Sequence, residues 1–461
     1  MKKSAFSKIL KRYLFLIYSK ELKKKEINLI FDKIILIFES NKIFKGDKKL
    51  WDENDFFLIT YADSIKKQKT KNFKVLGEFL KKYCNEFNFI HILPFFPFTS
   101  DDGFAVKDYK KIDKRHGEWT DFKKIADNFR VMSDLVINHC SSENKLFKNF
   151  LKDNSPGKDF FITFDNKPKN LSKITRPRSS ELLKKIKVNE DQKYVWCTFS
   201  HDQIDFNFKN PEVLIYFLKV IKFYLDKNIK AIRLDAVAFL WKELGTKCIN
   251  LPQTHEIIRF LRFIIEHFYG DTLLITETNV PSHENLSYFG NNNEAHCIYN
   301  FTLAPLVINA IISGNSFFLR NWSRSIPPAQ ENNAYLNFLS SHDGIGMRPI
   351  EGILPVDEMK KYFNFLEGEG GLLTYRNQGG KKSVYEVNIT LYDALKNSYF
   401  KEDNFGIQRF ALAHIIMFAF EGIPAVYIQN LVGSDNDLDK VNETGVNRSI
   451  NRKNWEYDEL I

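Results

Sequence analysis

Eight short apolar segments, separated by longer stretches with helical periodicity, constrain the fold of this 461-residue chain more than any other feature. Most of these segments are continuously apolar rather than alternating, as is typical of parallel strands that are covered on both faces. Eight such strands with helices between them predict an α/β fold, the (β/α)₈ or TIM barrel. The predicted strands span residues 56–61, 89–93, 131–137, 231–234, 273–276, 296–301, 335–339 and 425–428.

Two connections are too long to be plain loops of such a barrel. We predict an inserted subdomain over residues 140–212, after the third strand, and a second insertion over residues 344–405, after the seventh. Both follow the carboxyl end of a strand, where barrel enzymes carry their active sites, and insertions of this length are usually functional. Residues 1–50 are interpreted as an N-terminal helical extension. The catalytic barrel is assigned to residues 51–139, 213–343 and 406–461.

The positive charge of the chain is concentrated at its N-terminus. The formal net charge is +10, and the first 25 residues hold nine basic side chains and one acidic one. Lys, Asn, Ile and Phe are abundant together, as an AT-rich genome would produce. We therefore interpret the charge as compositional bias and predict neither a nucleic-acid partner nor a membrane partner.

The cysteines and apolar stretches indicate a reduced, cytoplasmic protein. The five cysteines show no C-x-x-C pair and predict neither a disulfide framework nor a zinc site. The apolar run at residues 13–18 is too short for a signal peptide. Residues 410–428 contain His414, Glu421 and Pro424, so we interpret them as a buried helix, a turn and a strand rather than a membrane span.

Polar and charged residues stand at the carboxyl ends of four predicted strands. Each has an ordinary structural explanation when taken alone: a turn cap, a helix cap or a buried salt bridge. Three carboxylates and two histidines at one barrel mouth are harder to explain, because burying them together costs several kcal/mol unless they are paired or do chemistry. The residues at the four strand ends are Asn138, His139, Arg233, Asp235, Glu277, His342 and Asp343.

This set of residues suits the cleavage of glycosidic bonds. A retaining mechanism needs one carboxylate as nucleophile and one protonated carboxyl as acid. Because Arg233 is expected to lower the pKa of Asp235, Asp235 is the candidate nucleophile. Glu277, near other carboxylates, is expected to have a raised pKa and to act as proton donor and then as base, while Asp343 stabilises charge on the sugar. Arg233 argues against a bound cation, so we predict no metal and no cofactor.

Four segments resemble the signature regions of the α-amylase superfamily of glycoside hydrolases, in the same order. They are Asp-Leu-Val-Ile-Asn-His139, Ile-Arg-Leu-Asp235-Ala-Val, Ile-Thr-Glu277 and Ser-His342-Asp343. Further segments resemble the sucrose phosphorylase branch, and the likeness covers about residues 55–461. They are His-Ile-Leu-Pro-Phe-Phe-Pro at 91–97, Asp101-Asp102-Gly103-Phe104, Arg176-Pro177-Arg178, His342-Asp343-Gly344-Ile345-Gly346, Tyr385-Glu-Val-Asn388 and Ile450-Asn451-Arg452.

The resemblance implies a glycosyltransferase-type glycoside phosphorylase. Asp235 would form a glucosyl ester while Glu277 protonates the leaving oxygen, and inorganic phosphate, the co-substrate, would then release α-glucose 1-phosphate. The residues implied for holding the glucosyl group are Asp101, Phe104, His139, Arg233 and His342. Those implied near phosphate and acceptor are Arg448, Tyr385 and, less directly, Arg178.

The acceptor side fits plain sucrose phosphorylases less well. Glu386 stands where these relatives tend to have Gln, and Phe239 where they tend to have Tyr. The segment after Asp343 is more similar to relatives that act on glucosylglycerate or sucrose 6-phosphate. We therefore favour glycerate, or another acidic acceptor, over fructose. The alternatives are an α-glucoside hydrolase or transglucosidase with the same residues, an inactive truncated relative, and a sugar-binding or regulatory barrel.

The resemblance further implies a last barrel helix and a C-terminal β domain after Arg452, and we expect both to be missing from a chain that stops at Ile461. Such a loss would uncover apolar surface, whose burial is worth roughly 25 cal/mol per Å². Four explanations stay open: a truncated gene product, a separately encoded remainder, coverage by residues 1–50, or coverage by a second subunit in a homodimer.

Overall fold

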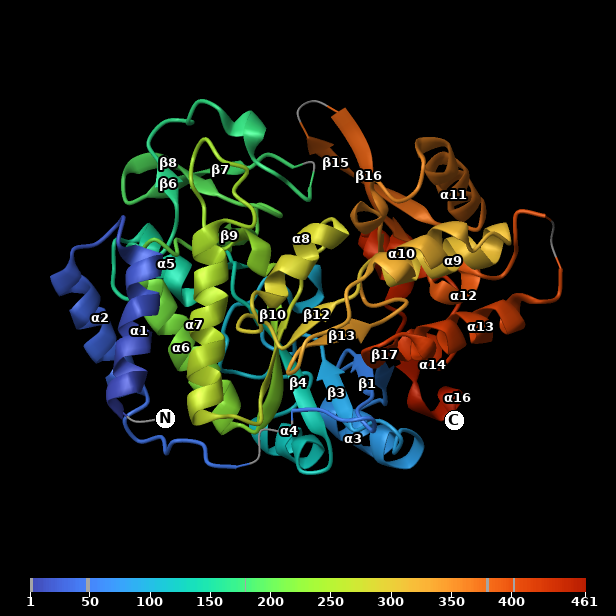
Figure 1. Ribbon diagram of the computed structural model, residues 1–461, viewed down its shortest axis with the longest axis horizontal. Coiled ribbons are helices and arrows are strands. Elements are labelled where there is room, and N and C mark those ends of the chain that lie inside the picture. Colours follow the sequence, from blue (N-terminus) through green and yellow to red (C-terminus); the bar gives the residue numbers. More distant parts are fainter. Residues whose placement is uncertain (1–2, 47–49, 179, 379–380, 401–402) are drawn as a thin grey trace.

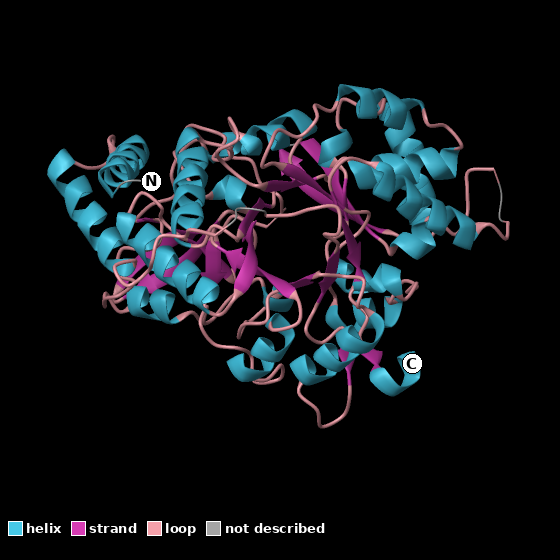
Figure 2. Cartoon of the chain, turned by 60° about the horizontal axis from the view of Figure 1, so that its bottom comes forward, coloured by secondary structure: helices cyan, strands magenta, loops and turns pink. Residues whose placement is uncertain are grey.

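Eight parallel strands close into a barrel in this computed structural model, which describes residues 3–46, 50–178, 180–378, 381–400 and 403–461. Figure 2 shows the strands as a ring with helices outside it. The order around the ring is β1-β17-β13-β12-β11-β10-β4-β3, so the predicted (β/α)₈ fold is confirmed. The strands are β1 (Phe57–Thr60), β3 (Phe89–Ile92), β4 (Arg130–Val136), β10 (Ile229–Asp235), β11 (Leu273–Thr276), β12 (Cys297–Tyr299), β13 (Ala334–Asn337) and β17 (Ile423–Tyr427).

Amphipathic helices cover the outside of the barrel. The start of the α6 helix shows how the sequence sets their ends: Asn210 accepts a hydrogen bond from the Glu212 N–H, and Pro211 occupies the first turn. The apolar face of α6, including Phe217 and Ile221, is fully buried. The covering helices are α3 (Asn72–Tyr83), α4 (Trp119–Ala126), α6 (Pro211–Asp226), α7 (Pro252–Phe268), α8 (Ser282–Leu286), α9 (Leu303–Ser313), α10 (Phe317–Ser325) and α13 (Gly406–Ala419).

Two groups of elements interrupt the alternation of strands and helices, and Figure 1 shows both on the same side of the barrel. The first, between β4 and α6, contains β5 (His139–Ser141), α5 (Lys145–Leu151), β6 (Thr163–Phe164), β7 (Leu183–Val188), β8 (Asp191–Trp196) and β9 (Gln203–Asp205). The second, between β13 and α13, contains β14 (Ile345–Gly346), α11 (Val356–Gly368), β15 (Leu372–Gln378), β16 (Lys381–Asn388) and α12 (Leu391–Ala394). Ser179, Gly379, Gly380, Lys401 and Glu402 of these segments lie outside the described residues.

The N-terminal segment forms two helices, α1 (Lys3–Tyr18) and α2 (Lys24–Ile37), that pack on α7 and α6 (Figure 1). Their apolar faces are buried there, and the Phe6 ring stacks on Phe263 with centroids 5.2 Å apart. The explanation in which residues 1–50 cover the last strand is wrong for α1 and α2, because these helices pack on α7 and α6 and lie away from β17 in Figure 1.

The last strand is followed by short elements only: α14 (Ile428–Leu431), α15 (Leu438–Thr444), β18 (Trp455–Glu456) and α16 (Tyr457–Leu460), of which β18 pairs with β2 (Ile65–Lys66). The expectation of a buried helix before β17 is wrong for α13. Ala413 and Met417 face the barrel, whereas Ile407, Ile415 and Phe418 are between 50% and 68% exposed, because no described element covers this outer face. Among the described helices, none is long and apolar enough to cross a membrane.

Candidate active site

The polar residues at the strand ends meet in one pocket, with an empty volume of about 730 Å³, at the carboxyl end of the barrel. Arg233 lies beneath this pocket and is 3% exposed. The pocket is also lined by residues that the sequence had not singled out, among them Phe199, Gln203 and Asn279. The predicted residues that line it are Asp101, Phe104, His139, Arg178, Asp235, Glu277, His342, Asp343, Tyr385 and Arg448.

The end of β10 orients the two carboxyl groups of Asp235 and Glu277. Arg233 and Asp235 are two residues apart on the strand and therefore point to the same side. Ala236, which follows, adopts φ +50°, a left-handed conformation that few residues other than glycine accept. In this turn its N–H donates a 3.0 Å hydrogen bond to Glu277 Oε2. The backbone strain thus serves to position an acidic side chain.

The Arg233 guanidinium group lies close to three carboxylates, those of Asp134, Asp235 and Glu277. Arg233 Nη1 donates a 2.8 Å hydrogen bond to Asp235 Oδ1 and also pairs with Asp134, which is fully buried. Arg233 Nη2 lies 4.0 Å from Glu277 Oε2. His91 Nε2 lies 2.7 Å from the other oxygen of Asp134. A buried cation between carboxylates fixes their geometry, because removing either partner would leave an uncompensated charge.

The pKa values of the two carboxyl groups are both raised. Burial raises the pKa of Asp235 well above its ordinary range, and Arg233 opposes this shift without outweighing it. Burial also raises the pKa of Glu277. The expectation that Arg233 keeps the pKa of Asp235 low is therefore wrong, because desolvation is the larger effect. Both carboxyl groups therefore hold a proton more readily than free carboxyls, and of the two it is Asp235 that accepts a direct hydrogen bond from Arg233.

The third carboxylate, Asp343, is in a different environment. Burial alone would raise its pKa, but Arg448 first, and then Arg452 and Arg233, bring the pKa below its ordinary value. Asp343 pairs directly with Arg448 and lies 3.7 Å from Arg452 Nη2. Asp343 therefore ionises more readily than a free aspartate, in contrast to Asp235 and Glu277.

The two histidines of the pocket are neutral hydrogen-bonding groups. Burial lowers the pKa of His342 well below its ordinary value and lowers that of His139 as well. The Phe104 ring stacks on the His342 ring with centroids 4.9 Å apart. His139 Nε2 lies 3.0 Å from the Phe104 carbonyl oxygen. The aromatic ring and both imidazoles thus form one packed wall.

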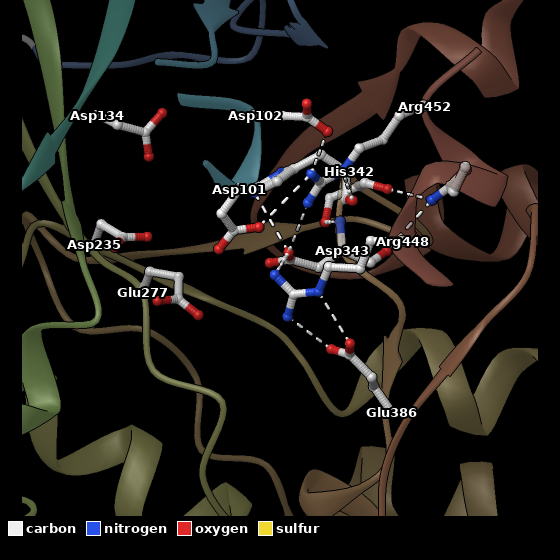
Figure 3. Close-up of polar contacts among 12 residues, drawn as sticks. Asp101, Asp102, Asp134, Asp235, Glu277, His342, Asp343, Glu386, Arg448 and Arg452 are labelled. Atoms are coloured by element: carbon white, nitrogen blue, oxygen red, sulfur yellow. Dashed lines mark hydrogen bonds and ion pairs between the residues drawn. The ribbon is translucent and has the colours of Figure 1, made fainter. Parts of the chain in front are cut away.

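Arg452 connects the C-terminal segment to the pocket by hydrogen bonds (Figure 3). In the sequence it stood out only as part of a segment that resembles related proteins. Its Nη1 donates a 2.6 Å hydrogen bond to Asp102 Oδ2, and its Nε donates to the His342 carbonyl oxygen at 2.8 Å. The side chain is 2% exposed. Its separation of more than 100 residues from these partners leaves no local sequence signal for the contact.

A buried lysine that sequence reasoning missed supports the turn carrying His139. Lys242 Nζ lies 2.8 Å from Asp205 Oδ2 and donates a 2.7 Å hydrogen bond to Asn138 Oδ1. Asp205 also accepts hydrogen bonds from the Thr198 N–H at 2.8 Å and the Thr198 hydroxyl at 2.6 Å. Asn138 is therefore more than a turn cap, because it joins β4 to the first insertion through this cluster.

Glu386 on β16 also lines the pocket and lies close to Arg448 (Figure 3). Arg448 Nε and Nη2 donate hydrogen bonds of 3.0 and 2.8 Å to the two Glu386 carboxylate oxygens. Arg178 Nη1 lies 3.6 Å from Glu386 Oε1. Tyr385, the neighbour of Glu386, also lines the pocket.

None of the five cysteines lines the pocket. All five cysteines are free and buried. Within the described part of the chain, no group of three or more His, Cys, Asp or Glu side chains could hold a metal ion.

Comparison with known proteins agrees with this geometry. The model of the alpha amylase catalytic domain matches residues 78–346. A glucosylglycerate phosphorylase from Escherichia coli is 42% identical over 434 residues, which are 93% of this chain and 77% of that protein. A second one, from Spirochaeta thermophila, is 40% identical over 411 residues, 89% of this chain and 70% of that protein.

The crystal structure of sucrose 6F-phosphate phosphorylase from Thermoanaerobacter thermosaccharolyticum superposes with a TM-score of 0.79 at 28% identity and covers 90% of this chain and 84% of that one. The domain match extends over more than half of the sequence and includes Asp235, Glu277 and Asp343. The chain therefore belongs to the α-amylase family.

Proposed function

We propose that this protein is a retaining glucosyl phosphorylase that transfers a glucosyl group between glycerate and inorganic phosphate. One observation carries the proposal: a carboxyl pair, Asp235 and Glu277, shares a pocket with two arginines, Arg178 and Arg448. The carboxyl pair suits glucosyl transfer and the arginines suit anionic acceptors. The names of the relatives at 40–42% identity support glycerate as the acceptor.

The first half of the reaction needs one proton on the carboxyl pair, and we place it on Glu277 because Asp235 accepts the direct Arg233 hydrogen bond. The ionised Asp235 attacks the anomeric carbon of the α-glucoside and forms a β-glucosyl ester. The bond from that carbon to the leaving oxygen breaks, and Glu277 gives its proton to this oxygen. Asp343 and the neutral His342 hold sugar hydroxyl groups, and the negative charge of Asp343 stabilises the positive charge that develops on the ring.

The second half of the reaction returns the proton. A phosphate oxygen attacks the anomeric carbon, the ester bond to Asp235 breaks, and the phosphate proton passes to Glu277. The product is α-glucose 1-phosphate, and two inversions give net retention. In the reverse direction the glycerate hydroxyl replaces phosphate as the nucleophile and glycerate carries the negative charge.

The arginines explain how an anion competes with abundant water for the same glucosyl group. Phosphate and glycerate are anions, whereas water is neutral. A guanidinium group binds such oxygens through two parallel hydrogen bonds, and its charge is permanent. Arg178 and Arg448 thus favour transfer to anionic acceptors over hydrolysis.

The reaction needs inorganic phosphate as co-substrate and no cofactor, and we place it in the cytoplasm, where free cysteines stay reduced. The other partners proposed are small molecules, with no nucleic acid and no membrane. The homodimer stays a prediction, which sedimentation velocity would test.

An acceptor panel tests the proposed function. Purified protein is incubated with glucose 1-phosphate and D-glycerate, glycerol, fructose or fructose 6-phosphate, and phosphate release is followed. Release that depends on glycerate supports the proposal. Release without any acceptor, together with free glucose, would show a hydrolase, and no release from folded protein would favour an inactive relative.

A further inference from the structure

We propose that Glu386 is a positioning residue for the acceptor arginines, acting as an internal anion that holds Arg448 and Arg178 in place. The inference rests on the proposed function, since it concerns how the acceptor end of the same pocket favours anions. Glu386 is 1% exposed, so a charge on it must be compensated by protein groups rather than by water.

The geometry fixes Arg448 from two sides. Glu386 accepts both hydrogen bonds of one edge of the guanidinium group, at 3.0 and 2.8 Å. The remaining nitrogen, Nη1, pairs with Asp343. Because a bidentate pair defines the plane of the guanidinium group as well as its position, Glu386 determines how Arg448 meets Asp343.

The same carboxylate reaches Arg178, which belongs to a different part of the chain. Arg178 lies in the first insertion, Glu386 on β16 of the second insertion, and Arg448 in the 3₁₀ helix Asn447–Asn451 near the C-terminus. Arg178 is held less tightly, by one contact of 3.6 Å, and its side chain is 24% exposed. Glu386 therefore joins three segments that are distant in sequence at one point of the pocket wall.

Charge explains why an acid is needed at this position. Two guanidinium groups would repel each other in a buried site, where Coulomb interactions are stronger than in water. The Glu386 carboxylate lies against both and neutralises one of their two charges. Asp343 also pairs with Arg448, so Arg178, the better exposed of the two arginines, is the one that can change partners when an anion arrives.

The variant Glu386→Gln tests this role, because it keeps the size of the side chain and removes its charge. The donor α-glucosyl fluoride is supplied with phosphate, and three quantities are measured: fluoride release, glucose 1-phosphate and glucose. The ratio of glucose 1-phosphate to glucose gives the partition of the glucosyl enzyme between phosphate and water. Glu351→Gln is the matched control, since Glu351 forms a 2.7 Å ion pair with Arg376 in the same insertion and does not line the pocket.

We expect Glu386→Gln to lower the partition toward phosphate at least tenfold and to raise the KM for phosphate, and to lower the rate of fluoride release by a smaller factor than the partition. Glu351→Gln is expected to keep the wild-type partition. The variant Glu386→Asp keeps the charge but is one methylene shorter, and we expect a partition between those of wild type and Glu386→Gln. This second variant decides the matter if Glu386→Gln does not fold.

An unchanged partition in folded Glu386→Gln or Glu386→Asp would overturn the inference, and so would an equal loss of fluoride release and phosphate transfer, which would indicate general damage. Failure of the proposed function is distinguishable, because wild type itself would then form glucose and no glucose 1-phosphate.

Discussion

Replacing Lys242 by Met removes the cation of a fully buried cluster and leaves the shape of the side chain nearly intact. Lys242 is the only described cation within hydrogen-bonding distance of Asp205. Its side chain is 2% exposed and that of Asp205 is completely buried. The variant therefore leaves an uncompensated buried carboxylate, a change that typically costs about 3–5 kcal/mol.

The expected loss can be converted into a melting temperature. An unfolding entropy of about 2.1 cal/mol/K per residue gives roughly 1 kcal/mol/K for a chain of this size. A loss of about 4 kcal/mol then lowers Tm by about 4 °C. Because Asn138 Oδ1 loses the hydrogen bond from Lys242 and Asn138 precedes His139, we also expect kcat/KM for the glucosyl donor to fall about tenfold.

Urea unfolding followed by tryptophan fluorescence measures the stability change, and initial rates with the donor measure the effect on catalysis. The double variant Lys242→Met/Asp205→Asn is the control, since replacing both charges removes the uncompensated one. It is expected to be more stable than Lys242→Met alone. Wild-type stability in Lys242→Met, or additive losses in the double variant, would refute the reasoning.

Three further predictions concern single residues of the site. Asp235→Asn should lower kcat at least 10⁴-fold, by analogy with the loss of other catalytic carboxylates. Binding of glucose 1-phosphate, measured by calorimetry, should persist. Turnover close to that of wild type would reject Asp235 as the nucleophile. Burial raises the pKa of Glu277, so the folded state binds more protons than the unfolded state and stability falls as pH rises above about 4. We therefore expect Glu277→Gln to be more stable than wild type at pH 7 but not below pH 4. Urea unfolding at both pH values tests this expectation, and the opposite order of stabilities would contradict it. Arg452→Met removes hydrogen bonds to His342 and Asp102; we expect a loss of about 1–3 kcal/mol in urea unfolding and a higher donor KM, and an unchanged KM would contradict its role at the pocket.

The barrel could be predicted from the sequence because each strand is buried on both faces and is therefore continuously apolar. The grouping of polar residues at the strand ends could also be predicted, because Asp235 and Glu277 come at the ends of such apolar runs and the parallel strands of a barrel end at the same face. The same apolar pattern gave a wrong prediction for the burial of the outer helix α13. Its composition is as apolar as that of a buried helix, and only the three-dimensional arrangement shows that Ile407 and Ile415 are exposed.

The contacts around the pocket could not be predicted, because they join residues far apart in sequence. Asp205 ends strand β9 and Lys242 lies in the connection between β10 and α7, and nothing near Lys242 in the sequence marks it as buried. Glu386 was recognised only as a departure from related sequences, and its pairing with Arg448 depends on how β16 meets the C-terminal segment. The pKa of Asp235 was predicted in the wrong direction, because sequence shows the neighbouring Arg233 but not the extent of burial.

The central claim is that Asp235 carries the glucosyl group between donor and phosphate, and it can be observed directly. Glu277→Gln is incubated with α-glucosyl fluoride, which needs no proton for its departure, and the protein is analysed by intact mass and peptide mapping. We predict an added mass of one glucosyl unit on the peptide that contains Asp235, removed again by azide, a small anionic nucleophile that needs no general base. Absence of this adduct when fluoride is released, or an adduct on another residue, would contradict the account.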